Sequence, residues 1–220
     1  DYGNDRVQYF TAAGFFLGKW GTHGTGNGQF DHPSGIAVAP NGRVYVGDRS
    51  NYRIQYFTAT GSFLGKWGSK GSANGQFSPP RAVAVARNGN VYVADQYNHR
   101  VQYFTPTGSF LGKWGSEGSG NGQLNNPVGI AIAPDGNVYV ADSSNARIQY
   151  FTPTGSYLGK WGKFGHNIPG LFASPHGLAF SPSGARIYVA DSGNNRIQYF
   201  NRNKPAVSPA SLGRVKALFR

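Results

Sequence analysis

One polar motif recurs along this 220-residue chain with residue types that ligand binding or catalysis could use. Asp-x-x-Asn-x-Arg occurs five times, as Asp1-Asn4-Arg6, Asp48-Asn51-Arg53, Asp95-Asn98-Arg100, Asp142-Asn145-Arg147 and Asp191-Asn194-Arg196. It uses five of the nine acidic residues. The motif could form five ligand sites. It could instead be a strut in which Asp closes one strand, Arg opens the next, and Asn takes a left-handed or Asx-turn position. We favour the strut, because a catalytic group is normally unique and has a tuned environment.

The histidines give a weaker signal, for a metal. They are His23, His32, His99, His166 and His176. No two have the His-x-x-x-His spacing of a helical metal site, and we count acidic residues as scarce near them. No nucleophile–base pattern is visible, and the glycine-rich run 24–28 precedes a strand instead of joining a strand to a helix. We therefore expect no catalytic residue, no metal site and no cofactor.

Composition limits the classes of protein that this chain can be. The 33 Gly and 13 Pro residues favour short strands joined by turns, and 15% aromatic against 14% charged residues indicates a folded chain. There is no Cys, so disulfides and thiolate metal sites are excluded, and no apolar run is long enough for a transmembrane segment. The net charge of +12 predicts weak attraction to nucleic acid, anionic lipid or acidic glycans.

A repeat of about 47 residues organises the chain. Trp20, Trp67, Trp114 and Trp161 are 47 residues apart, each within Gly-Lys-Trp-Gly. The second full unit has four runs rich in β-branched and aromatic residues, at 82–86, 90–94, 100–105 and 110–114, which we call strands a, b, c and d. Asn-Gly separates a from b, and Thr-x-x-Gly separates c from d. Each unit is predicted to be a four-stranded antiparallel meander, as in the blade of a propeller.

These residues carry a family resemblance. The pattern Pro-x-Gly-Ile-Ala-Val-x-Pro-x-Gly-x-Val-Tyr-Val-x-Asp-x-x-Asn-x-Arg-Ile-Gln-x-Phe resembles the NHL repeat, and the likeness covers residues 1–200. The resemblance implies an all-β fold, a β-propeller of four-stranded antiparallel blades. The family includes protein-binding modules, RNA-binding domains and a few lyases, whose histidine metal ligands lie at the mouths of the blades. The resemblance therefore predicts the fold but does not select a function.

The chain holds about four and a half repeats. We divide it into units 1–21, 22–68, 69–115, 116–162 and 163–200, followed by a basic tail at 201–220 that could form a short amphipathic helix or a disordered end. The first unit has only strands c and d and the last lacks d, which gives seventeen strands, whereas six family blades would have 24. We expect a missing upstream segment. There are two alternatives: a partner copy closes the propeller, or strand d of the first unit completes the last unit. The absence of Met suggests a processed, trimmed or partial chain.

Binding is expected on one face of the propeller. The d–a and b–c connections share a face and vary between units, while the a–b and c–d turns on the other face are nearly constant. Arg, Tyr and His supply much of the chemistry of recognition. The candidate binding residues are Arg49, Tyr52, Arg81, Tyr97, His99 and His176.

We therefore expect a non-enzymatic scaffold that binds a protein or polysaccharide partner through this face. RNA binding through the same basic loops is the alternative, and a metal-dependent lyase is a third hypothesis. The lack of Met and the near-identical, aromatic-rich units favour a secreted or cell-surface bacterial protein.

Overall fold

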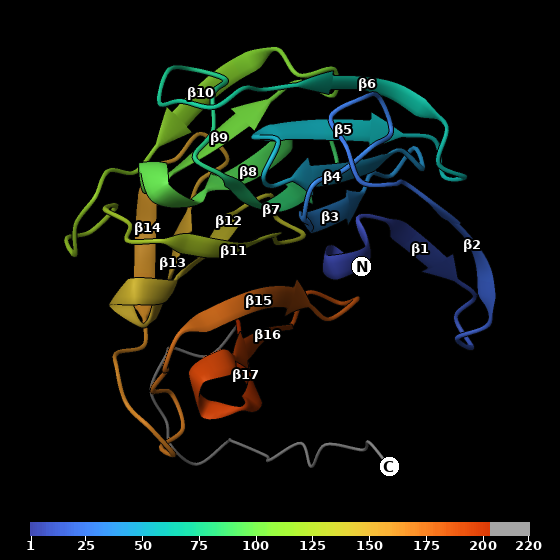
Figure 1. Cartoon of the computed structure of the whole chain (residues 1–220). Coiled ribbons are helices and arrows are strands. Elements are labelled where there is room, and N and C mark those ends of the chain that lie inside the picture. Colours follow the sequence, from blue (N-terminus) through green and yellow to red (C-terminus); the bar gives the residue numbers. More distant parts are fainter. Residues whose placement is uncertain (203–220) are drawn as a thin grey trace.

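Short strands ended by tight turns make up most of the computed structural model, which describes residues 1–202 (Figure 1). A half-blade contains β1 (Val7–Phe10) and β2 (Phe16–Trp20). Blade I contains β3 (Pro33–Val38), β4 (Val44–Asp48), β5 (Arg53–Phe57) and β6 (Phe63–Trp67). Blade II contains β7 (Pro80–Val85), β8 (Val91–Asp95), β9 (Arg100–Phe104) and β10 (Phe110–Trp114). Blade III contains β11 (Pro127–Ile132), β12 (Val138–Asp142), β13 (Arg147–Phe151) and β14 (Tyr157–Trp161). Blade IV contains β15 (Pro175–Phe180), β16 (Arg186–Asp191) and β17 (Arg196–Asn201).

Each sheet is an antiparallel meander, and the sheets stand around a common axis (Figure 1). The innermost strands β3, β7, β11 and β15 contact one another in that order. Helical structure in the described part of the chain is confined to single turns before the third strand of a blade, at Tyr2–Asn4, Gln96–Asn98, Ser143–Asn145 and Ser192–Asn194. The predicted all-β propeller of four-stranded antiparallel units is confirmed. No helix within residues 1–202 is long and apolar enough to cross a membrane.

The inner strand of each blade begins earlier than the sequence pattern predicts. β7 starts at Pro80 and not at Ala82, because Pro80 already pairs with Asp95 before the register shifts between Pro80 and Ala82. Such a bulge leaves the intervening residue outside the regular ladder and re-aims its side chain. The residue displaced in this way is Arg81, one of the predicted binding residues.

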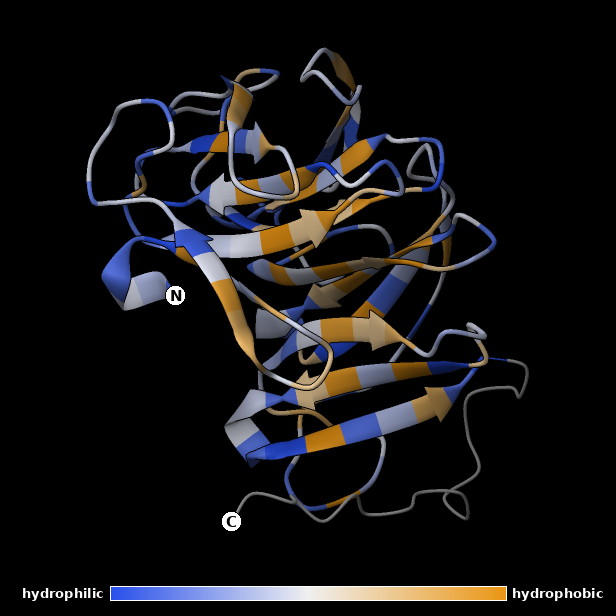
Figure 2. Ribbon diagram, turned by 90° about the vertical axis from the view of Figure 1, so that its right-hand side faces the viewer, coloured by the Kyte–Doolittle hydropathy of each residue, from blue (hydrophilic) through white to orange (hydrophobic). Residues whose placement is uncertain are grey.

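The hydrophobic core lies between blades. Hydrophobic and polar residues alternate along the strands (Figure 2), so each sheet presents apolar side chains to its neighbours. Tyr45 and Ile54 of blade I are buried against Phe77, Val93 and Phe104 of blade II, and the same arrangement joins blades II and III. Each blade therefore depends on the next one to bury its apolar face.

Two apolar sheet faces have no blade over them in the described structure. Ile36 of β3 is 52% exposed, whereas Ile130, its counterpart in blade III, is 7% exposed. Ile197 of β17 is 58% exposed, whereas its counterpart Ile148 is fully buried. The half-blade covers only the outer part of blade I, through Val7 and Trp20. Asn201 of the predicted tail still belongs to β17, and residues 203–220 lie outside the described part of the chain.

Candidate binding face

The Asp-x-x-Asn-x-Arg motif forms a polar strut around a buried Asp in each of blades I to IV. In blade II, the fully buried Asp95 carboxylate accepts hydrogen bonds from Arg100 Nε at 2.7 Å, Asn98 Nδ2 at 2.9 Å and Gln102 Nε2 at 3.1 Å. It also accepts the backbone N–H of Ser78 at 2.7 Å. Blades I, III and IV repeat the Asp–Arg pair at 2.6 to 2.8 Å. The predicted pairing of Asp and Arg across the turn is therefore present.

The strut also holds the connector that enters its blade. The Arg100 guanidinium donates to the backbone carbonyls of Ser72 at 2.6 Å and of Ala73 and Gln76 at 2.9 Å. Gln102 Nε2 donates to the carbonyl of Gln76 at 2.7 Å. One buried cluster thus fixes both the b–c turn and the d–a connector, and these are the two loops that carry the candidate binding residues.

Two parts of the strut differ from the sequence interpretation. The left-handed residue is not Asn but the one after it, such as His99 with φ 53°. Asn98 instead uses its side-chain N–H groups to reach Asp95 and the carbonyl of Gly71. Sequence reasoning also missed the role of Gln102, although a Gln recurs two residues after every motif Arg.

Four of the six predicted binding residues are grouped around Arg81, which shares a hollow with Arg49 and lies near Tyr97 and His176. Arg49 and Arg81 line a hollow of about 400 Å³. Burial, and then the nearby charge of Arg49, lower the pKa of Arg81. Burial, and then the charge of Arg81, lower the pKa of His176, which lies at the same bulge position in blade IV. Tyr97 is 54% exposed, and it lies near enough to Arg81 to raise the pKa of Arg81, against the effects of burial and Arg49.

The two guanidiniums of this cluster have no acidic partner among residues 1–202. Arg49 Nη1 donates to the Tyr2 hydroxyl at 2.8 Å, while Arg49 Nε is buried without a hydrogen-bond partner. Asp1 also lines the hollow, but its carboxylate accepts hydrogen bonds from Asn4, Arg6 and Gln8. A buried donor without a partner is costly.

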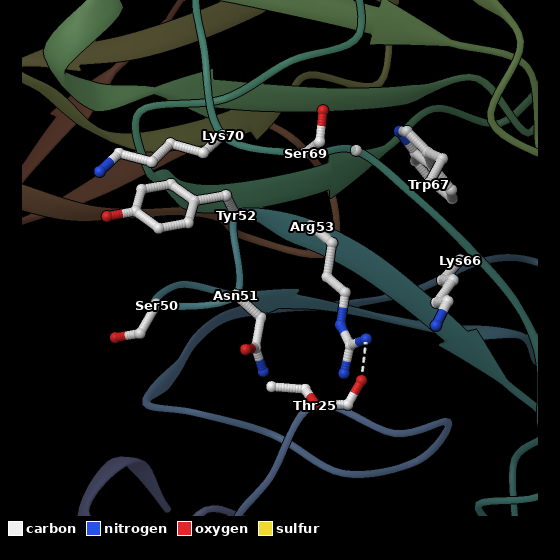
Figure 3. Close-up of a pocket in the computed structure, with 10 residues that line it drawn as sticks. Thr25, Ser50, Asn51, Tyr52, Arg53, Lys66, Trp67, Ser69 and Lys70 are labelled. Carbon is white, nitrogen blue, oxygen red and sulfur yellow. Dashed lines mark hydrogen bonds between the residues drawn. The ribbon is translucent and has the colours of Figure 1, made fainter.

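The other two predicted residues, Tyr52 and His99, lie apart from this hollow, in the junctions between blades. Both occupy the left-handed position that ends the b–c turn, with φ 55° and 53°. His99 Nδ1 accepts the backbone N–H of Asn126 at 3.3 Å. The Lys70 ammonium lies 5.3 Å from the centre of the Tyr52 ring (Figure 3). Tyr52 and Lys70 line a second, open hollow of about 540 Å³ together with Lys66.

Acidic residues approach two of the histidines, contrary to our count from the sequence. One ligand atom each from Asp5, Asp31 and His32 lie within 4.8 Å of one another. His23 Nδ1 is 3.0 Å from Asp5 Oδ2. Although burial raises the pKa of Asp5, the hydrogen bonds from the His32 backbone and the His23 ring outweigh it and hold that pKa below its usual value. Asp31 precedes His32 directly in the chain, so part of this cluster was visible in the sequence.

Comparison with known proteins identifies the repeat. The family model described as the NHL repeat matches residues 30–57, 77–104, 124–151 and 172–200. Each match runs from the end of the d–a connector through strands a, b and c. The curated protein sequences contain no match to this chain.

Several solved propellers have a similar backbone. A streptogramin B lyase is 19% identical with a TM-score of 0.66, and the match covers 91% of this chain and 60% of that one. A catalytically inactive virginiamycin B lyase from Staphylococcus aureus with quinupristin is 18% identical with a TM-score of 0.65, covering 92% of this chain and 61% of that one. Hydrazine synthase from Kuenenia stuttgartiensis is 18% identical with a TM-score of 0.59, covering 77% and 46%. This chain spans about 60% of the length of these lyases. The likeness shows the fold alone.

Proposed function

This chain belongs to the NHL-repeat family, and we propose that it is a non-enzymatic binding module that holds a carboxylated polysaccharide on its d–a and b–c loop face. The observation that carries the proposal is the pair Arg49 and Arg81, which share a hollow in the described structure without an acidic partner. Guanidinium groups bind carboxylates through paired, charge-assisted hydrogen bonds. Exposed tyrosine rings beside the hollow, at Tyr2 and Tyr97, add apolar contact area. We place this binding outside the cell or at its surface.

The test measures binding to polygalacturonate, with neutral dextran as the reference polymer. Replacing Arg49 and Arg81 together by Ala should weaken binding at least tenfold, because each charge-assisted hydrogen bond contributes about 1.5–3 kcal/mol. The matched control is Arg43→Ala with Arg87→Ala, which removes the same charge from the a–b turns on the opposite face. Equal losses of affinity in the two double variants would show that only net charge matters, and would contradict a binding site at Arg49 and Arg81.

His176 adds a pH dependence to the same experiment. Because burial and Arg81 lower its pKa from 6.5, His176 is neutral at pH 7 and gains its proton only at lower pH. Affinity for polygalacturonate should therefore rise as the pH is lowered below 6.5, over the range in which the sugar carboxylates remain ionised. The rise should be absent in His176→Gln.

A protein partner would present the same carboxylates, so a poly-glutamate peptide is included as a competitor. If it displaces polygalacturonate at lower concentration than galacturonate oligomers do, the partner is an acidic protein segment.

RNA binding is the second candidate, favoured by the net charge of +12. Electrostatic binding to single-stranded RNA falls steeply with salt. The polysaccharide proposal would be replaced by an RNA-binding one if the chain bound poly(U) more tightly than polygalacturonate. That binding should weaken with added salt and be lost in the Arg49 and Arg81 double variant.

A further inference from the structure

The junction between the half-blade and blade I gathers metal-ligating side chains from two separate segments. Asp5 comes from the b–c turn of the half-blade, and Asp31 and His32 come from the connector that enters β3. One ligand atom from each of the three lies within 4.8 Å of the others. His23, from the start of the same connector, places Nδ1 3.0 Å from Asp5 Oδ2. Two carboxylates and the His32 imidazole therefore lie within 4.8 Å of one another on the loop face, and the His23 ring contacts one of the carboxylates, Asp5.

The backbone turns the donor atoms of this junction toward one another. Asp5 and His32 both have left-handed backbone angles, with φ 49° and 55°. Asp5 Oδ1 accepts the His32 backbone N–H at 2.7 Å, which leaves Oδ2 on the side of His23. His32 Nδ1 lies 2.5 Å from Asp31 Oδ1. The Tyr2 ring packs on His32 with 4.6 Å between ring centres.

The other three junctions show that the loop does not need these residues to fold. The positions of Asp31 and His32 are filled by Ser78 and Pro79, by Asn125 and Asn126, and by Ala173 and Ser174. Asn126 and Ser174 take the same left-handed conformation as His32, with φ 51° and 62°. Of the four acidic residues outside the struts, two lie in this junction together with two of the five histidines. The other junctions therefore show no structural need for a carboxylate at position 31 or an imidazole at position 32.

The set of donor atoms selects the class of ion. Ca²⁺ and Mg²⁺ prefer sites built entirely from oxygen, whereas carboxylate oxygens mixed with imidazole nitrogens suit Zn²⁺ and related transition-metal ions. Zn²⁺ usually takes four ligands in a tetrahedron. We propose that Asp5, Asp31 and His32 form a Zn²⁺-type site, with His23 as the fourth ligand, that ties the half-blade turn to the connector of blade I. This site is independent of the polysaccharide proposal.

The test is equilibrium dialysis of the chelator-treated protein against Zn²⁺ alone, followed by metal analysis. The wild-type chain should bind one tight equivalent of Zn²⁺ and melt at higher temperature with it. The double substitution Asp31→Asn with His32→Asn copies Asn125 and Asn126 of the third junction, which already have a suitable backbone. It should weaken Zn²⁺ binding by at least 100-fold and abolish the thermal shift.

Two further variants keep the proposal open to refutation. His23→Ala changes an exposed ring and should weaken binding about tenfold, even if the double variant folds poorly. Asp135→Asn with His166→Ala removes the same residue types elsewhere and should leave binding unchanged. The proposal is overturned if the wild-type chain takes up no stoichiometric Zn²⁺, or if uptake survives in both junction variants.

Discussion

A buried carboxylate is tolerated in these blades only because every part of it is occupied. The Asp95 oxygens accept four hydrogen bonds, and its partner Arg100 satisfies three backbone carbonyls besides. Removing charges from water costs several kcal/mol per ion, and only such complete pairing offsets that cost. The main role of the strut is therefore to fix the positions of two loops, because the cost of burying its charges offsets much of the stability gained from pairing them.

Asp95→Ala should destabilise the protein by about 3–5 kcal/mol, because it leaves the buried Arg100 guanidinium without its counter-ion. The comparison is Asp135→Ala, which breaks the exposed pair with Arg202 and should cost at most about 1 kcal/mol. Urea unfolding of both variants measures the difference. Similar costs for the two variants would contradict the role of the strut.

The sequence was sufficient to place some candidate residues and not others. Arg49, Arg81 and His176 could be predicted to share a face because the meander topology puts the d–a and b–c loops together. Tyr52 and His99 could not be excluded from that group, since their residue types do not indicate the left-handed conformation that ends the b–c turn. The approach of Asp5 to His32 was hidden because a whole hairpin of the half-blade separates them along the chain.

At the scale of elements, the c–d turns of blades I, II and III each pack on the tryptophan of the preceding unit. Gly108 in the turn of blade II has φ 94°, and a Cβ added there would lie 2.6 Å from Cδ2 of Trp67 in blade I. The same contact joins Gly61 to Trp20 and Gly155 to Trp114. The recurring Thr-x-x-Gly pattern therefore indicates both a turn and an interblade contact.

Gly108→Ala should cost about 1–2 kcal/mol for its backbone angle and roughly 1–3 kcal/mol more for the clash with Trp67. Gly75→Ala isolates the first contribution, because Gly75 has φ 80° and open space where its Cβ would lie. Thermal or urea unfolding should rank Gly108→Ala as clearly less stable than Gly75→Ala. Equal losses would mean that the turn does not pack on the indole in solution.

Strand existence and order could be predicted, because Gly-rich turns and β-branched runs recur in every unit. The start of the inner strand was misplaced, since the pattern suggested that Pro80 precedes the strand. In the structure Pro80 opens β7 and faces Asp95, and the bulge follows it. The bulge shifts the phase of the alternation, but only Pro80 lies before it in the strand, and one residue is too few to show that shift in the sequence.

At the scale of the whole molecule, stability depends on neighbouring blades covering one another. Blades II and III have a neighbour on each side, whereas the inner part of blade I and the outer face of blade IV have none in the described structure. Exposed side chains mark both faces, at Ile36 and Val38 on one and Ile197 on the other. Single exposed apolar residues are common on protein surfaces, but these residues occupy positions at which the other blades pack against a neighbouring blade.

The loss in the free energy of unfolding when equivalent isoleucines are replaced by Ala measures whether another sheet covers these faces in solution. Ile130→Ala empties a packed contact between blades II and III and should cost about 2–5 kcal/mol. Ile36→Ala changes the same position on a side chain that is 52% exposed and should cost under about 1 kcal/mol. Urea unfolding at two protein concentrations gives both values and their concentration dependence. If Ile36→Ala costs as much as Ile130→Ala, another sheet covers blade I, and a cost that grows with protein concentration would show that a second copy provides it.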